Sequence, residues 1–119
     1  MDSVGKPARK AILFHLEETL EAQLASALRA SAWEAIPSSQ SFTAAPDDVI
    51  FCNAGAAFLT AKATFPGVPV VVVNRVAEID QWLDALEAGA ADYVAAPFEE
   101  IKIRWLLQAL PATAISAVA

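Results

Sequence analysis

Several residue types are scarce in this chain of 119 residues. It contains one cysteine (Cys52) and one histidine (His15), so an internal disulfide is excluded and a zinc site has too few ligands. Eight basic residues against fourteen acidic ones give a net charge of −6, which disfavours direct binding to nucleic acid. No apolar run approaches the roughly 20 residues that cross a membrane. The run AILFHL after the polar N-terminus is too short for a signal peptide. We therefore expect a soluble cytoplasmic protein without a metal or cofactor.

The residues that are abundant indicate a folded α/β domain. Apolar residues make up 56% of the chain and charged residues 18%, a balance typical of globular proteins. Uninterrupted apolar runs predict strands that are covered on both faces, and apolar residues at spacings of three and four predict helices. The predicted strands are 10–15, 33–36, 48–52, 68–73 and 92–96, and the predicted helices are 17–32, 54–65, 77–89 and 97–110. This alternation favours an open, doubly wound parallel sheet.

The pattern also predicts where the domain begins and ends. Residues 1–9 read as a disordered lead, residues 10–111 as one domain, and residues 112–119 as a tail or the start of a linker. Pro111 is expected to end the last helix, because proline cannot donate a backbone hydrogen bond. Residues 37–48 are rich in turn-forming residues, which leaves room for only about one or two helical turns.

One stretch gives the domain a family resemblance. Residues 69–98 read PVVVVNRVAEIDQWLDALEAGAADYVAAPF. In its order of strand, helix, ALEAGA helix end, DY strand and PF, this segment resembles the response-regulator receiver family. The residues APDDVIF and, more loosely, AILFHLEE resemble the lead-ins to other strands of that family. The resemblance implies a CheY-like, flavodoxin-like (βα)5 fold with strand order 2-1-3-4-5. The short segment between the second and third strands implies a shortened second helix.

The resemblance also implies where phosphorylation chemistry would lie. Receivers carry two acids after the first strand, a phosphorylated aspartate ending the third, a hydroxyl residue after the fourth and a lysine after the fifth. The acids hold a magnesium ion, and the ion and the lysine neutralise the phosphoryl group. In this chain the acidic pair falls on Leu16 and Glu17, or on Glu17 and Glu18 after a shift of one residue. The acceptor falls on Cys52 or Asn53, the hydroxyl position on Asn74 and the lysine position on Ala96.

These replacements predict a pseudo-receiver. Neither Cys52 nor Asn53 can form an acyl phosphate, and Ala96 carries no charge. Only Tyr93, at the position of the aromatic switch residue, keeps its usual type. The chain is therefore expected to keep the fold without phosphotransfer and not to act as an enzyme.

The predicted working surface is formed by the helices at 77–89 and 97–110 and the strand between them. Ile79, Leu83 and Leu86 are expected to supply the core stripe of the first helix, and Ile103, Leu106, Leu107 and Leu110 that of the second. Trp82 and the pair Ile101 and Trp105 lie off these stripes. Exposed tryptophans mark protein interfaces. The predicted interface comprises Ile79, Trp82, Tyr93, Ile101 and Trp105.

The expected function is therefore that of a receiver-like signalling module, which acts without phosphorylation as a homodimer or through a protein partner. It would be the regulatory domain of a two-component response regulator or a transcriptional regulator. An alternative is a redox or small-ligand sensor centred on Cys52, although free cysteine is more often a buried, inert residue. His15 is expected to be bonded to backbone. The least favoured alternative is an active phosphoreceiver that uses Glu17, Glu18 or Asp48, the last of which lies at the wrong end of its strand.

Overall fold

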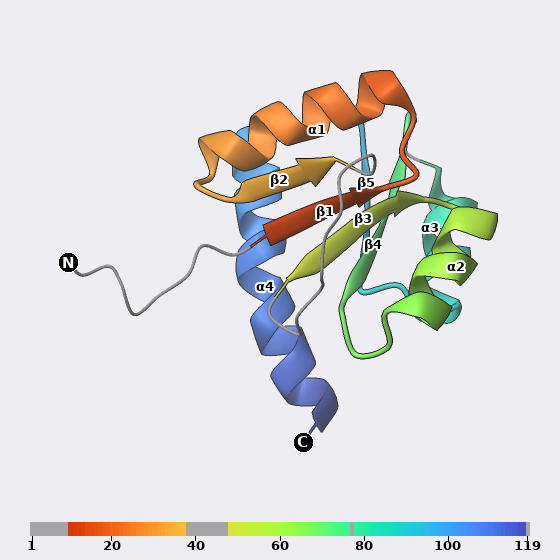
Figure 1. Ribbon diagram of the computed structural model, residues 1–119. Helices are drawn as coiled ribbons and strands as arrows, with labels where there is room; N and C mark the ends of the chain where they lie inside the picture. The colour runs from red at the N-terminus through yellow and green to blue at the C-terminus, as the bar shows by residue number, and fades with distance from the viewer. Residues whose placement is uncertain (1–9, 38–47, 77, 119) are drawn as a thin grey trace.

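The computed structural model describes residues 10–37, 48–76 and 78–118, and it shows five parallel strands in one sheet (Figure 1). The strand order is β2-β1-β3-β4-β5, as predicted. The strands are β1 (Lys10–Phe14), β2 (Glu34–Pro37), β3 (Val49–Asn53), β4 (Val70–Asn74) and β5 (Asp92–Ala95). The helices are α1 (Glu18–Ala30), α2 (Ala56–Thr64), α3 (Ile79–Glu87) and α4 (Glu100–Val118).

The central strands form the core because each has four successive apolar residues. Parallel strands joined by helices are covered on both faces, so successive side chains enter two separate cores. Leu13 and Phe51 lie in the core beneath α1 and α4, whereas Ile12 and Ile50 lie in the core beneath α2 and α3. Phe14 is in register with Cys52, and Asn53 is in register with Val73. The carboxyl ends of β1, β3 and β4 therefore meet at one edge of the sheet.

The predicted core residues of α4 are confirmed. Within residues 100–110 of α4, the buried residues are those expected from their spacing, and they pack in the same core as α1 (Ile103, Leu106, Leu107 and Leu110). Trp105 and Ile101 lie off this stripe and are 65% and 53% exposed.

The prediction that Ile79, Leu83 and Leu86 form the core stripe of α3 is wrong. Their exposed fractions are 68%, 51% and 38%, and Ala85 is the one buried residue of this helix. The reason is the position of α3 at the end of the sheet, beside β5, whose residues are themselves only partly buried. The helix contacts the sheet through a small residue, and its large apolar side chains are left uncovered.

Two further predictions concern segments that connect or end the helices. The helix predicted to stop at Pro111 continues to Val118, and its last turns extend beyond the sheet in Figure 1. Proline removes one backbone donor and crowds the carbonyl four residues earlier, which weakens a helix without always ending it, and half of residues 112–119 are alanine, the best helix former. The shortened second helix, expected within residues 37–48, falls almost wholly outside the described residues. The part of the chain that is described has no helix long and apolar enough to span a membrane.

Candidate functional site

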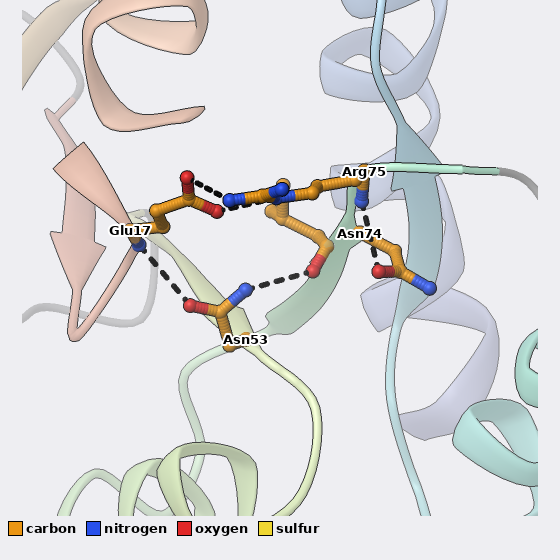
Figure 2. A network of polar contacts seen from close by, with 5 residues as sticks. Glu17, Asn53, Asn74 and Arg75 are labelled. Atoms are coloured by element: carbon orange, nitrogen blue, oxygen red, sulfur yellow. Dashed lines mark hydrogen bonds and ion pairs between the residues drawn. The ribbon is translucent and has the colours of Figure 1, made fainter. Parts of the chain in front are cut away.

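A polar network joins the carboxyl ends of β1, β3 and β4 (Figure 2). Its central residue is Asn53, the last residue of β3. The Asn53 side-chain oxygen accepts a hydrogen bond from the backbone N–H of Glu17 at 3.2 Å. The Asn53 side-chain nitrogen donates to the carbonyl of Val73 at 3.3 Å. One neutral amide thus links the loop after β1 to β4. Gly55 occupies the N-cap position of α2, so Asn53 is engaged in this network and does not cap that helix.

The strongest charge interaction of the network joins Arg75 and Glu17. The Arg75 Nε donates to Glu17 Oε1 at 2.6 Å, and the Arg75 Nη2 atom pairs with Glu17 Oε2. A bidentate contact of this kind matches the planar guanidinium fork to a carboxylate. Hydrogen bonding to Glu17 and, second, the charge of that carboxylate raise the pKa of the Arg75 guanidinium above its ordinary value. Figure 2 shows the guanidinium reaching across from the end of β4.

Sequence reasoning missed Arg75. A signal for it was present, because a basic residue directly follows the buried strand β4. Parallel strands present their carboxyl ends at one edge, so this residue was placed to meet an acid that follows β1.

A second set of contacts connects the end of β4 to β5 and α3. Asn74 Oδ1 accepts from the backbone N–H of Arg75 at 2.8 Å. Asn74 Nδ2 donates to the Tyr93 hydroxyl at 2.9 Å and also to Gln81 Oε1. The Tyr93 hydroxyl in turn donates to the carbonyl of Val76 at 3.2 Å. The hydroxyl of Tyr93 therefore uses both its donor and its acceptor capacity at this edge of the sheet.

The structure separates the alternatives that the sequence left open for the acids. Glu17 lies in the network, whereas Leu16 is buried in the α1 core and Glu18 is an exposed residue of the first turn of α1. Ala96 lies close by, because it lines a cavity of about 290 Å³ together with Glu17 and Arg75. The Ala96–Pro97 peptide bond is cis. Within the described ranges, no group of three or more histidine, cysteine or acidic residues could hold a metal ion.

Cys52 does not lie in this network. Its side chain is 0% exposed and belongs to the core beneath α2 and α3. Burial raises the pKa of the Cys52 thiol to about 12, so the thiol is protonated at neutral pH. Of the two candidate acceptor positions, only Asn53 therefore has its side chain in the polar network.

His15 and Asp48 also lie apart from the polar network. His15 is exposed, has a positive φ of 53° and stacks edge-on against Phe14. Asp48 is buried at the opposite end of β3, where it forms an ion pair with Lys10 at 3.7 Å.

The predicted interface residues surround a groove between α3 and α4, above β5. The groove has a volume of about 580 Å³. Ile79 and Trp82 line it from α3, Tyr93 from β5 and Trp105 from α4. Ile101 is exposed one turn before Trp105 and is not among the lining residues. Trp82 is 43% exposed and Trp105 is 65% exposed, so two large aromatic side chains remain open to solvent.

Comparison with solved structures identifies the architecture. No protein-family model matches the sequence, and no curated protein matches it significantly. The chain is similar to a CheY-like protein (TadZ) from Pseudomonas aeruginosa, with 18% identity and a TM-score of 0.61 over 86% of this chain and 98% of that one. It is similar to a response regulator from Thermotoga maritima, with 14% identity and a TM-score of 0.71 over 89% and 99%.

A third similar structure is a response regulator receiver domain protein from Clostridium thermocellum. It has 12% identity and a TM-score of 0.64 over 86% of this chain and 93% of that one. At these identities the similarity concerns the backbone arrangement, with the same sheet order and alternation of helices. The chain has the fold of the response-regulator receiver domains.

Proposed function

We propose that this chain is a receiver-like signal-transduction module that works by protein–protein contact without phosphorylation. The contact surface is the one formed by α3, β5 and α4. Two observations support the proposal: the residues at the carboxyl edge lack the chemistry of phosphotransfer, and an uncovered apolar groove lies between α3 and α4.

The described residues at the end of β3 offer no carboxylate that could accept a phosphoryl group. At the end of β3 the chain has the amide of Asn53, which is occupied by two hydrogen bonds. Ala96 supplies no cation to neutralise a phosphoryl group. Glu17, the one acid in the network, is paired with Arg75, so a positive charge already lies where receivers hold a metal ion. These contacts stabilise the carboxyl edge of the sheet through side-chain and backbone groups of the chain itself.

The observation that carries the proposal is the exposure of Trp82 and Trp105 on opposite walls of one groove. Contact between apolar side chains and water is unfavourable. A second protein that covers them gains about 25 cal/mol for each Å² of apolar surface removed from water. Tryptophan is enriched among the residues that dominate binding energy. The exposure of Ile79, Leu83 and Leu86, which the sequence had assigned to the core, makes this surface larger than expected.

The alternative functions have less support. A redox or ligand sensor at Cys52 requires an accessible thiol of lowered pKa, whereas this thiol is buried and its pKa is raised. Phosphorylation of a displaced acid requires a free carboxylate at this edge, whereas Glu17 is paired with Arg75, Glu18 is exposed on α1 and Asp48 lies at the other end of β3.

The proposal is tested by comparing the wild type with Trp82→Ala/Trp105→Ala, and a Trp33→Phe variant that keeps Trp82 and Trp105 is prepared so that its tryptophan fluorescence reports only the groove. Sedimentation and the capture of partner proteins are compared for both forms. The wild type is expected to self-associate or to retain a partner, and the double variant to lose this, with truncation costing about 1–3 kcal/mol per tryptophan. Leu59→Ala, which removes an exposed apolar residue of α2, is the matched control. A monomeric wild type whose tryptophans are shielded from a quencher contradicts the proposal.

A further inference from the structure

The exposed side chains of α3 lie in two neighbouring rows. The first is apolar, with Ile79, Trp82, Leu83 and Leu86 at spacings of three, one and three residues, and it borders the groove. Residues three or four apart share a face of a helix. By the same rule Asp80, Asp84 and Glu87 form a second row along the outer side of the first. A molecule that covers the apolar row therefore meets a line of carboxylates at its edge.

Two of the three acids of α3, Asp84 and Glu87, are not explained by the stability of the helix. The helix has no basic residue, and Asp84 and Glu87 lie in its last turns, where the macrodipole disfavours negative charge. Within the described ranges, no lysine or arginine forms an ion pair with Asp80, Asp84 or Glu87. The positions of Asp84 and Glu87 lower helix stability slightly, whereas Asp80 in the first turn is favoured by the macrodipole, so a role outside the helix accounts better for Asp84 and Glu87.

The α4 wall does not neutralise this charge. Lys102 lines the groove, but its ammonium is paired with Glu99 at 3.7 Å. Arg104 is paired with Glu100 on α4 itself. Glu78 and Asp92 add two more carboxylates to the lining of the groove. The groove is therefore lined mainly by apolar side chains, with Glu78 and Asp92 in its lining and the carboxylate row of α3 beside its α3 wall.

We propose that this groove receives a cationic amphipathic helix of another protein. The proposal rests on the proposed function, in which this face is the contact surface, and it adds the chemistry of the partner. An apolar stripe on the partner helix would cover the apolar row of α3 and Trp105 of α4, in the way that amphipathic helices occupy apolar grooves. Lysine or arginine on its flanks would face the carboxylate row. A cavity of about 150 Å³ holds one benzene molecule, so 580 Å³ accommodates several apolar side chains.

A second copy of this chain fits the groove less well. A two-fold contact places the same surface on both sides. The carboxylates of α3 would then approach an identical acidic rim, whose nearby cations are already paired on α4. Like charges placed opposite each other at an interface are destabilising.

The experiment uses three synthetic peptides of roughly 18 residues, long enough to form a helix. The first has leucines at helical spacing and lysines elsewhere. The second has glutamate in place of lysine. The third has the composition of the first in strictly alternating order, which suits a strand. Binding to the whole chain is measured by fluorescence anisotropy at low and high salt. We expect the cationic helical peptide to bind at least about tenfold more tightly than the other two, with a preference that weakens as salt is added.

Two charge-reversal variants make the test specific. Asp80→Lys/Asp84→Lys should reverse or remove the preference for the cationic peptide. Glu18→Lys/Glu34→Lys, which changes the net charge equally on exposed residues of α1 and β2, should keep it. Equal binding of both helical peptides to the wild type, stronger binding of the alternating peptide, or the same loss in the control variant overturns the inference.

The outcomes separate this inference from the function on which it rests. Self-association of the wild type that requires Trp82 and Trp105, with no peptide preference, overturns the cationic-helix partner and leaves the contact surface in place. Peptide binding that Trp82→Ala/Trp105→Ala does not change overturns both.

Discussion

Arg75 and Glu17 are 58 residues apart in the sequence, and they form a bidentate ion pair across the carboxyl edge of the sheet. The pair joins the end of β4 to the loop after β1, on either side of β3. Its guanidinium places one positive charge beside the acid that, by resemblance to receivers, would bind a metal ion. The charge of this edge is therefore balanced by the chain itself.

The first prediction concerns phosphorylation. Acetyl phosphate or beryllofluoride with magnesium should leave the mass and the backbone NMR spectrum of the protein unchanged, because Asn53 and Ala96 supply neither nucleophile nor cation. Mass spectrometry and NMR titration check this. An active receiver treated in parallel provides the positive control, and a stoichiometric adduct on this chain would contradict the pseudo-receiver interpretation.

The second prediction concerns the amide of Asn53. Asn53→Ala removes the acceptor for the Glu17 N–H and the donor to the Val73 carbonyl. We expect the free energy of unfolding to fall by about 1–3 kcal/mol, since two partly buried backbone groups lose their partners. Urea denaturation measures the change, and Thr60→Ala on the exposed side of α2 serves as the control. A variant as stable as the wild type would show that water replaces the amide without cost.

A third prediction concerns the pH dependence of stability. Because burial raises the pKa of the folded Cys52 thiol to about 12, the folded state keeps its proton where the unfolded state, with a pKa near 9, begins to lose it. The contribution of Cys52 is fully present below pH 9 and declines as the pH rises toward 12. The stability difference between the wild type and Cys52→Ala should shift in favour of the variant above pH 9.

Denaturation of both proteins at neutral pH and at about pH 10 measures this shift, and the subtraction removes the titration of groups they share. A thiol reagent should label Cys52 slowly until the protein unfolds. Rapid labelling of the folded protein would instead favour the sensor alternative.

The fourth prediction separates surface from core on the two helices that line the groove. Leu83→Ser on α3 should change the free energy of unfolding by less than about 0.5 kcal/mol, because Leu83 is half exposed. Ile103→Ala on α4 should cost about 2–5 kcal/mol, because Ile103 is fully buried. Chemical denaturation compares the two variants. A large loss of unfolding free energy in Leu83→Ser would contradict the half-exposed position of Leu83 on α3.

The sequence predicted the sheet well, because each central strand has four successive apolar residues, a pattern that a sheet covered on both faces accounts for. It predicted the core residues of α4 for a related reason, as Ile103, Leu106, Leu107 and Leu110 share one face of the helix. The same periodicity misled for α3. A helical stripe shows that Ile79, Leu83 and Leu86 lie together, but it carries no information about what covers them. That depends on the width of the sheet beneath, which ends at β5.

The polar site was harder to predict than the fold. The position of Asn74 beside Tyr93 follows from the pairing of β4 with β5. The choice between Cys52 and Asn53 depended on which strand face enters the α2–α3 core, and a shift of one residue reverses it. Arg75 was overlooked because its partner Glu17 is 58 residues away in the sequence. The two residues come together only when β1, β3 and β4 are aligned in one sheet.

The two hydrogen bonds of the Tyr93 hydroxyl have a consequence for the kinetics of association. They fix the ring against the end of β4 and the loop that follows it, so the Tyr93 part of the groove wall is already ordered before any ligand arrives. A preorganised wall has no rotamer freedom left to lose. The observed binding rate should then rise in proportion to ligand concentration without a plateau, because no slow rearrangement of the domain precedes or follows the encounter.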